Sequence, residues 1–194
     1  MEIILASASP RRAELLKQID IDFKVVTAGI NEEYEEGMPA FQVVYELAAR
    51  KAEAVFDKLL PTEDTVIIAS DTVVSLDDNI LGKPIGREGA YDMLKSLSGR
   101  SHSVYTGVSI YYYCNKKIKV DTFVEETKVY FDDMSHEEIK QYIATGEPFD
   151  KAGAYGIQGY AAKYISKIEG DYYTVVGLPL RKVYRSLKEN GICC

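Results

Sequence analysis

Two neighbouring arginines stand at the start of a predicted helix, where cations are unfavourable. The run Ser7-Ala8-Ser9-Pro10-Arg11-Arg12 follows a strand-like apolar segment, residues 3–6, and opens a helix with Ser9 as expected N-cap and Pro10 as first residue. A helix N-terminus already carries partial positive charge and exposed N–H groups, so a bound anion would relieve the conflict. Either arginine alone is better explained as an accidental surface cation. The pair together with Ser7 predicts an anion-binding site.

An aspartate interrupts the apolar, β-prone run of residues 65–76. Apolar extended sequence resumes two residues after Asp71, so a turn is a poor explanation for this acid. A buried carboxylate is costly unless a cation, a metal or several donors meet it. Asp71 is therefore the best single candidate for a catalytic or metal-binding group, with a structural buried ion pair as the alternative.

Two lysines are further candidates for the anion site. Lys51 falls on the apolar stripe of the clearest predicted helix, residues 39–60, and the alternative is a lysine that snorkels from the edge of that face. Lys83 heads a loop shaped by Gly82, Pro84 and Gly86, which lacks the spacing of a Walker loop. Taken alone, Lys83 would be an exposed turn lysine.

A glycine-rich loop is predicted between residues 149 and 159. Its three glycines recur at intervals of three in a run without helical or strand periodicity, so the backbone can approach a ligand closely. Lys151 adds a cation to this loop. The amide of Gln158 offers a donor and an acceptor to a base edge. A purely structural connection is the alternative.

Brought together, these side chains would bind and cleave a polyphosphate. Asp71 and an acid such as Glu32 could hold a divalent metal cation, Mg or Mn, because oxygen ligands without histidine or thiolate suit these ions. Hydrolysis of a nucleoside triphosphate needs neutralised phosphoryl charge and a positioned water. The cradle for the phosphates would consist of Ser7, Arg11, Arg12, Lys51, Lys83 and Lys151.

The composition restricts the kind of protein. The 194 residues are 46% hydrophobic and 27% charged, so we expect one soluble domain over residues 1–194. The formal net charge of -7 argues against a nucleic-acid binder, which needs many cations on one face. No apolar run is long enough for a membrane span or a signal sequence, so we expect a cytoplasmic protein. Cys114, Cys193 and Cys194 are expected to be free thiols, and His102 and His136 to be structural.

Hydrophobic periodicity predicts the elements that position these residues. Helices are expected over residues 39–60, 89–97, 135–145 and 179–190, the third of them with a capping box at its start. A hairpin is expected from 163–169 to 172–176, turning at residues 170 and 171. Strands are expected over 23–27, 65–76, 103–113 and 118–131. The tyrosine-rich strands suggest packing in the sheet or a contact in a homodimer.

The sequence resembles the Maf proteins, a family of nucleotide pyrophosphatases, almost from end to end. The resemblance implies an α/β fold with an elongated, twisted mixed sheet, flanking helices and two lobes around a central cleft, similar to the inosine triphosphate pyrophosphatases. Six matching blocks occur in order and are together highly specific: Ser7-Ala8-Ser9-Pro10-Arg11-Arg12, Ser70-Asp71-Thr72, Gly82-Lys83-Pro84, Leu97-Ser98-Gly99-Arg100, Asp150-Lys151-Ala152-Gly153-Ala154-Tyr155-Gly156-Ile157-Gln158-Gly159 and Val176-Gly177-Leu178-Pro179.

The resemblance also implies an activity and residue roles. The expected reaction cleaves a nucleoside triphosphate between its α- and β-phosphates and gives the monophosphate and pyrophosphate. Asp71 falls on the family's catalytic proton acceptor, and Arg12, Thr72 and Gln158 look like the specificity set of the branch that hydrolyses dTTP and UTP. The positions that bind phosphate or metal correspond to Ser7, Arg11, Glu32, Lys51 and Lys83.

Two other functions stay open. A non-catalytic regulator that binds a nucleotide would need the cradle but no positioned base, and family members are associated with septum formation and division arrest. A pyrophosphatase for noncanonical purine nucleotides would keep the chemistry and change the base. The embedded Asp71 favours an enzyme over a regulator.

Overall fold

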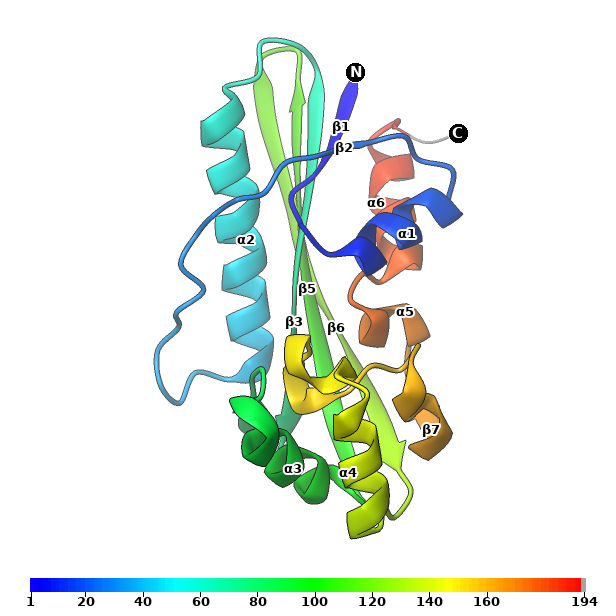
Figure 1. The fold of residues 1–194 in the computed structure, drawn as a ribbon. Helices are drawn as coiled ribbons and strands as arrows, with labels where there is room; N and C mark the ends of the chain where they lie inside the picture. The colour runs from blue at the N-terminus through cyan, green and yellow to red at the C-terminus, as the bar shows by residue number, and fades with distance from the viewer. Residues whose placement is uncertain (193–194) are drawn as a thin grey trace.

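A seven-stranded mixed sheet runs the length of the molecule (Figure 1). The structure, a computed structural model, describes residues 1–192. The strands follow the order β2-β1-β3-β5-β6-β7, and β4 pairs with β3. Pairing is parallel among β1, β2 and β3 and antiparallel elsewhere. The strand bounds are β1 Glu2–Leu5, β2 Lys24–Val25, β3 Thr65–Leu76, β4 Asn79–Leu81, β5 Ser101–Cys114, β6 Lys117–Phe131 and β7 Ile165–Glu169.

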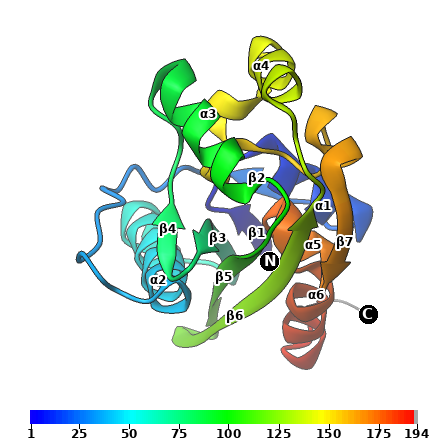
Figure 2. The ribbon, with the colours of Figure 1, turned by 90° about the horizontal axis from the view of Figure 1, so that it is seen from below.

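Helices cover both faces of the sheet. The long helix α2 packs on β3 and β5, and Figure 2 shows α5 and α6 on the opposite side. Helices α3 and α4 lie together at one end, where they close a second part of the core. The helix bounds are α1 Pro10–Gln18, α2 Ala40–Leu59, α3 Gly86–Leu97, α4 His136–Ala144, α5 Tyr172–Val176 and α6 Leu180–Glu189, with short 3-10 turns at Glu147–Asp150, Ala152–Ala154 and Tyr160–Tyr164.

One edge of β3 is left open in its middle. Strand β5 pairs with β3 along residues 65–75 on one edge. On the other edge β1 pairs with residues 65–68 and β4 with residues 74–76. Residues 69–73 therefore have no strand neighbour on that edge, and Asp71 and Thr72 lie in this gap.

A glycine lets α2 approach the strand next to this gap. Gly107 on β5 pairs in register with Asp71, and a Cβ atom at Gly107 would lie 2.1 Å from the carbonyl oxygen of Val44 on α2. Lys51 is two helical turns after Val44, and so it lies on the same face of α2. With α2 packed closely on the sheet, the long side chain of Lys51 reaches Asp71.

Most of the predicted elements are confirmed. The helix predicted over residues 39–60 is α2, and the run of residues 65–76 forms β3 with the predicted bounds. The two long strands are β5 and β6, and the capping box of α4 is formed by Ser135 and Glu138. The expected α/β class, the elongated sheet and its flanking helices are thus observed. No helix in the described part of the chain has the length and apolar character of a membrane span.

The predicted hairpin over residues 163–176 is wrong in its second half. Residues 165–169 form β7, but residues 172–176 form helix α5. Asp171 caps this helix by accepting a hydrogen bond from the backbone N–H of Tyr173, and Gly177 ends it in a left-handed conformation with φ of 118°. These caps outweigh the β propensity of a short Tyr-Tyr-Thr-Val-Val run.

Two smaller expectations also need correction. The strand predicted over residues 23–27 is reduced to the two residues of β2 at the edge of the sheet. Ser9 stands at the N-cap of α1, but its side chain makes no capping hydrogen bond. Instead, the backbone N–H of Ser9 donates to Oγ of Ser7 at 3.2 Å. The expectation for Cys193 and Cys194 lies outside the described residues, and Cys114 is a free thiol.

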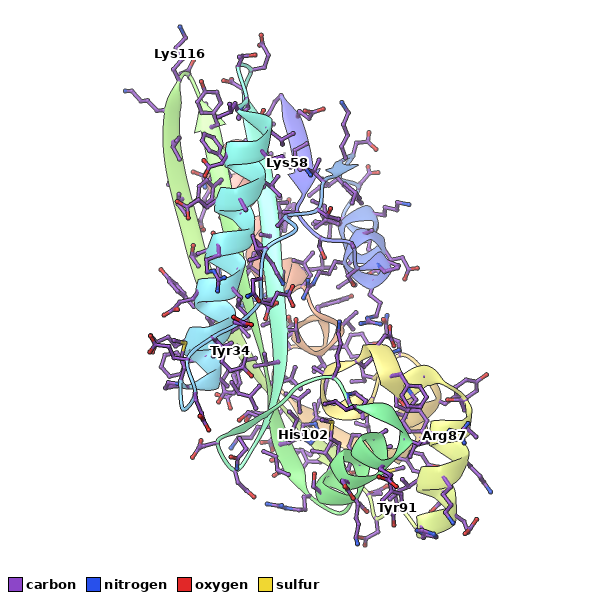
Figure 3. The ribbon with its side chains drawn as sticks, turned by 60° about the vertical axis from the view of Figure 1, so that its left-hand side comes forward. Tyr34, Lys58, Arg87, Tyr91, His102 and Lys116 are labelled. Atoms are coloured by element: carbon purple, nitrogen blue, oxygen red, sulfur yellow. The ribbon has the colours of Figure 1, made fainter. Side chains whose placement is uncertain are left out.

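His102 is buried in the end of the sheet close to α3 (Figure 3). Its Nε2 lies 2.7 Å from the hydroxyl of Tyr155, and its ring packs edge-to-face against Phe131. Burial lowers the pKa of His102 from 6.5 to about 4. The expected structural role agrees with this packing.

The lowered pKa predicts an acid dependence of stability. Below pH 6.5 the unfolded chain binds a proton at His102 that the folded protein resists, so the free energy of unfolding should fall as the pH drops from 6.5 towards 4. The loss from this residue should total about 3 kcal/mol. Urea unfolding at pH 7 and pH 4.5 of the unsubstituted protein and of His102→Gln measures it. An equal pH dependence in both proteins would contradict the assignment.

Candidate active site

All ten predicted site residues line one cavity of about 550 Å³. The cavity lies at the open middle of β3. One side is formed by the segment from β1 into α1, and the other by the loop of residues 150–159, so the expected cleft between two parts of the molecule is present. The ten residues are Ser7, Arg11, Arg12, Glu32, Lys51, Asp71, Thr72, Lys83, Lys151 and Gln158.

Asp71 meets a buried lysine at the wall of the cavity. Lys51 Nζ lies 2.5 Å from Oδ1 of Asp71 and 2.7 Å from Oε1 of Glu32. Asp71 is 7% exposed and Lys51 9%. Burial raises the pKa of Glu32, but the hydrogen bond and charge of Lys51 outweigh this, so the pKa is lowered overall. Lys51 therefore does not snorkel from the helix edge; its charge lies between two carboxylates.

Arg12 joins three segments that are distant in the sequence. Its Nε donates to the carbonyl oxygen of Gly177 at 2.8 Å, and Nη1 donates to the carbonyl oxygen of Ser70 at 2.8 Å. Nη1 also lies 3.2 Å from Oγ of Ser7, and Nη2 lies 3.1 Å from Oγ1 of Thr72. All these partners are neutral. The positive charge of Arg12 is therefore held at the cavity wall by neutral groups, and the nearby carboxylates of Asp71 and Glu32 attract it through space.

Arg11 and Lys151 face each other across the cavity with an acid between them. Arg11 Nη1 lies 3.9 Å from Oδ2 of Asp150, and Lys151 Nζ lies 2.7 Å from Oδ1 of the same carboxylate. Both cations lower the pKa of Asp150, whose partial burial opposes the shift less strongly than the Lys151 hydrogen bond favours it. Asp150 thus stands where a ligand anion would meet both cations.

The glycine-rich loop is shaped around the carboxylate of Glu147. Oε1 accepts a hydrogen bond of 2.8 Å from the hydroxyl of Tyr142, and Oε2 accepts one of 2.8 Å from the backbone N–H of Tyr160. A Cβ atom at Gly159 would lie 2.1 Å from Oε2. Any side chain at this position would displace the carboxylate that holds the loop, and Gln158 lies next to it.

The cavity is more positive than the protein as a whole. It is lined by five cationic side chains and three carboxylates, in a chain with a formal net charge of -7. A cleft with an excess of one sign of charge and low-dielectric walls focuses the electric field. The positive potential is therefore concentrated in this cavity, although the protein as a whole is negative. A small polyanion fits this distribution better than a nucleic-acid backbone does.

The donor set of the cavity suits a hard divalent cation. Oxygen atoms of Glu32 and Asp71 already approach the same point charge, the amine of Lys51. Mg²⁺ is typically bound through one or two carboxylates plus substrate phosphates and water. Among residues 1–192, no group of three or more histidine, cysteine or acidic side chains could hold a metal ion. The protein part of a metal site here would therefore consist of two carboxylates.

Several residues that shape the site are not marked by any clear pattern in the sequence. Thr106 on β5 lies with its Oγ1 2.9 Å from Oγ1 of Thr72. Asp150, Glu147 and the carbonyl group of Gly177 likewise contact a predicted site residue or its loop. A hydroxyl on an apolar strand is the one sequence signal for Thr106, and such hydroxyls are common in strands. For Gly177 the position in a matching block was visible, but its contact with Arg12 was not.

Comparisons with known proteins identify a family and several relatives for this chain. Residues 2–190 match the family described as Maf-like protein. A dTTP/UTP pyrophosphatase of Carboxydothermus hydrogenoformans is 50% identical over 191 residues, which is 98% of this chain and 100% of that protein. A dTTP/UTP pyrophosphatase of Geobacillus sp. (strain WCH70) is 49% identical over 190 residues, with 98% of each chain covered.

A more distant similarity is found to a solved structure. The dITP/XTP pyrophosphatase from Mycobacterium abscessus matches with a TM-score of 0.43 and 14% identity, over 97% of this chain and 94% of that chain. This similarity is too remote to bear on function. The match over nearly all of the sequence and the 50% identity to a full-length relative show that the chain belongs to the Maf-like protein family.

Proposed function

We propose that this protein hydrolyses dTTP and UTP to the monophosphate and pyrophosphate, with a divalent metal ion. The observation that carries the proposal is the convergence of Asp71 and five cationic side chains on one cavity. The names of the relatives, dTTP/UTP pyrophosphatase, support the substrates.

The cations would bind the triphosphate. Arg11, Lys83 and Lys151 reach the cavity from three separate segments, and Arg12 adds a positive charge at its wall. Positive groups fixed before the reaction stabilise charge that develops on the phosphoryl oxygens and on the leaving pyrophosphate. Asp150 would have to give up its two cations to the substrate.

Asp71 would accept a proton from the attacking water. Its Oδ1 is held by Lys51, and Oδ2 has no protein partner among the described residues. Glu32 and Asp71 would together hold Mg²⁺ or Mn²⁺, which when bound neutralises phosphate charge and lowers the pKa of water. Lys51 keeps both carboxylates in place and itself lies within the cavity.

Thr72 and Gln158 would recognise the base. Both line the cavity, one from the open edge of β3 and the other from the glycine-rich loop. Hydroxyl and amide groups supply the donors and acceptors that distinguish one base edge from another. In this proposal the base would lie against the wall of the cavity that contains Arg12.

The test is pyrophosphate release from a nucleotide panel. Purified protein is incubated with dTTP, UTP, CTP, the purine triphosphates and ITP, with MgCl2, with MnCl2 or with EDTA. We expect pyrophosphate and the monophosphate from dTTP and UTP, and no product in EDTA. Binding without product would instead support a nucleotide-binding regulator. Preferential hydrolysis of ITP would show that the preferred substrates are noncanonical purine nucleotides. Release of inorganic phosphate alone would contradict cleavage between the α- and β-phosphates.

A further inference from the structure

Three threonines form a hydrogen-bonded chain that ends at the cavity wall. Thr72 Oγ1 lies 2.9 Å from Thr106 Oγ1, which in turn donates to the carbonyl oxygen of Thr174 at 2.7 Å. Thr106 is fully buried on β5. Thr72 lines the cavity and is the one residue of β3 that is not buried. The chain therefore connects the interior to the surface that meets a ligand.

The number of protons fixes the direction of each hydrogen bond. A threonine hydroxyl carries one proton and accepts up to two hydrogen bonds. The carbonyl oxygen of Thr174 can only accept, so the Thr106 proton lies on that bond. The bond between the two hydroxyls then uses the proton of Thr72. A guanidinium group can only donate, so the bond from Arg12 Nη2 occupies one acceptor position of Thr72.

We infer that Thr106 is a positioning residue for base recognition, because it commits the proton of Thr72 to the interior and leaves the cavity an acceptor. This inference rests on the proposed function. The ligand group that meets Thr72 Oγ1 is then an N–H donor, which we assign to the ring N3–H of uracil or thymine. Thr106 is not among the residues that line the cavity, so it acts through Thr72.

The chemistry of the pyrimidines explains the choice of N3–H. Uracil and thymine share this donor, flanked by two carbonyl groups, whereas cytosine has a bare nitrogen at position 3. A hydroxyl that can only accept pairs with the N3–H of uracil or thymine. Facing cytosine, the same hydroxyl oxygen would meet the lone pair of N3, and the two would repel each other. Leaving a buried polar group without a partner disfavours the wrong ligand strongly.

The surroundings of Thr72 leave room for such a contact. A Cβ atom at Gly177 would lie 3.3 Å from Thr72 Oγ1, so the glycine keeps the hydroxyl from being crowded. Arg12 has five N–H groups, and its described hydrogen bonds use four. The fifth is on Nη2, the atom bonded to Thr72. A donor beside an acceptor is the pattern that complements a carbonyl next to an N–H.

The test compares UTP with CTP in Thr106→Val. Valine has the shape of threonine without the hydroxyl, so the Thr72 proton is released and can turn towards the cavity as a donor. We expect the ratio of kcat/KM for UTP to kcat/KM for CTP to fall about tenfold, which corresponds to the loss of one hydrogen bond to the base. A role in folding alone would lower both values by the same factor and leave the ratio unchanged.

Two control variants isolate the effect. Thr106→Ser keeps the hydroxyl and should keep the ratio. Ser109→Ala removes another buried hydroxyl of β5, which pairs with Thr122 at 2.9 Å outside the cavity, and should also keep the ratio. If Thr106→Val does not fold, Thr106→Ala removes the same hydroxyl with a smaller side chain, and the same tenfold change is expected.

The outcomes separate this inference from the proposed function. No pyrophosphate from any nucleotide with the unsubstituted protein would refute the proposed function. Activity in the unsubstituted protein with an unchanged or increased UTP to CTP ratio in the folded Thr106 variants would overturn the role of Thr106 and leave the proposed function standing.

Discussion

Replacement of Asp71 by asparagine should reduce pyrophosphate release from UTP by about 10³-fold or more while the protein stays folded. Asparagine keeps the shape of the side chain and an oxygen that can accept a hydrogen bond. Lys51, which donates to Asp71 Oδ1 at 2.5 Å, can therefore donate to the amide oxygen instead. It cannot take a proton from water, and general-base groups typically contribute about 10²- to 10⁴-fold. Loss of a metal-holding charge would add to the effect.

The kinetic pattern distinguishes a role in the reaction from a role in binding. Because the group acts in the transition state, kcat should fall while KM changes little. The matched control is Asp77→Asn, which changes an exposed acid in the turn after β3 that pairs with Arg100. Near-normal turnover in Asp71→Asn would remove the proposed mechanism.

Replacement of Lys51 by methionine should lower turnover by about 10²- to 10³-fold, the usual effect of removing one fixed electrostatic group from an active site. Methionine fills the volume of the lysine stem on α2 but leaves Asp71 and Glu32 without the cation between them. Breaking a buried ion pair from one side costs stability, so a lower melting temperature is also expected.

The same variant tests the metal site by a second measurement. If Lys51 occupies the point to which both carboxylates are directed, its removal should strengthen Mn²⁺ binding measured by calorimetry without nucleotide, as turnover falls. Lys58→Met is the control, because Lys58 lies exposed on the same helix (Figure 3) and donates a hydrogen bond of 3.4 Å to the carbonyl oxygen of Thr27, away from the two carboxylates. Unchanged turnover and unchanged Mn²⁺ binding in Lys51→Met would together exclude the role given to this residue.

Prediction from the sequence was most reliable for long elements with strong local signals. The apolar stripe of α2, the β-prone run of β3 and the capping box of α4 each place their information within a few turns or within one strand. The prediction of a strand for the short segment that forms α5 was wrong, because five residues carry little periodicity and the two caps decide the conformation. Several charged side chains that line the cavity were also expected to lie together, since charged residues in apolar or glycine-rich surroundings need a partner, whereas Thr72 was expected only from the family resemblance.

The amino-acid sequence by itself determined the chemical composition of this site. It showed which charged, hydroxyl and amide side chains occur in segments suited to bind an anion or a base. Only the tertiary structure decided what each of them contacts. Arg12 and Gly177 are 165 residues apart in the chain, and Lys51 meets Asp71 because helix α2 packs on the sheet that contains β3. Local propensity acts over a few neighbouring residues, whereas these contacts follow from how helices and strands pack, and no short stretch of sequence contains that information.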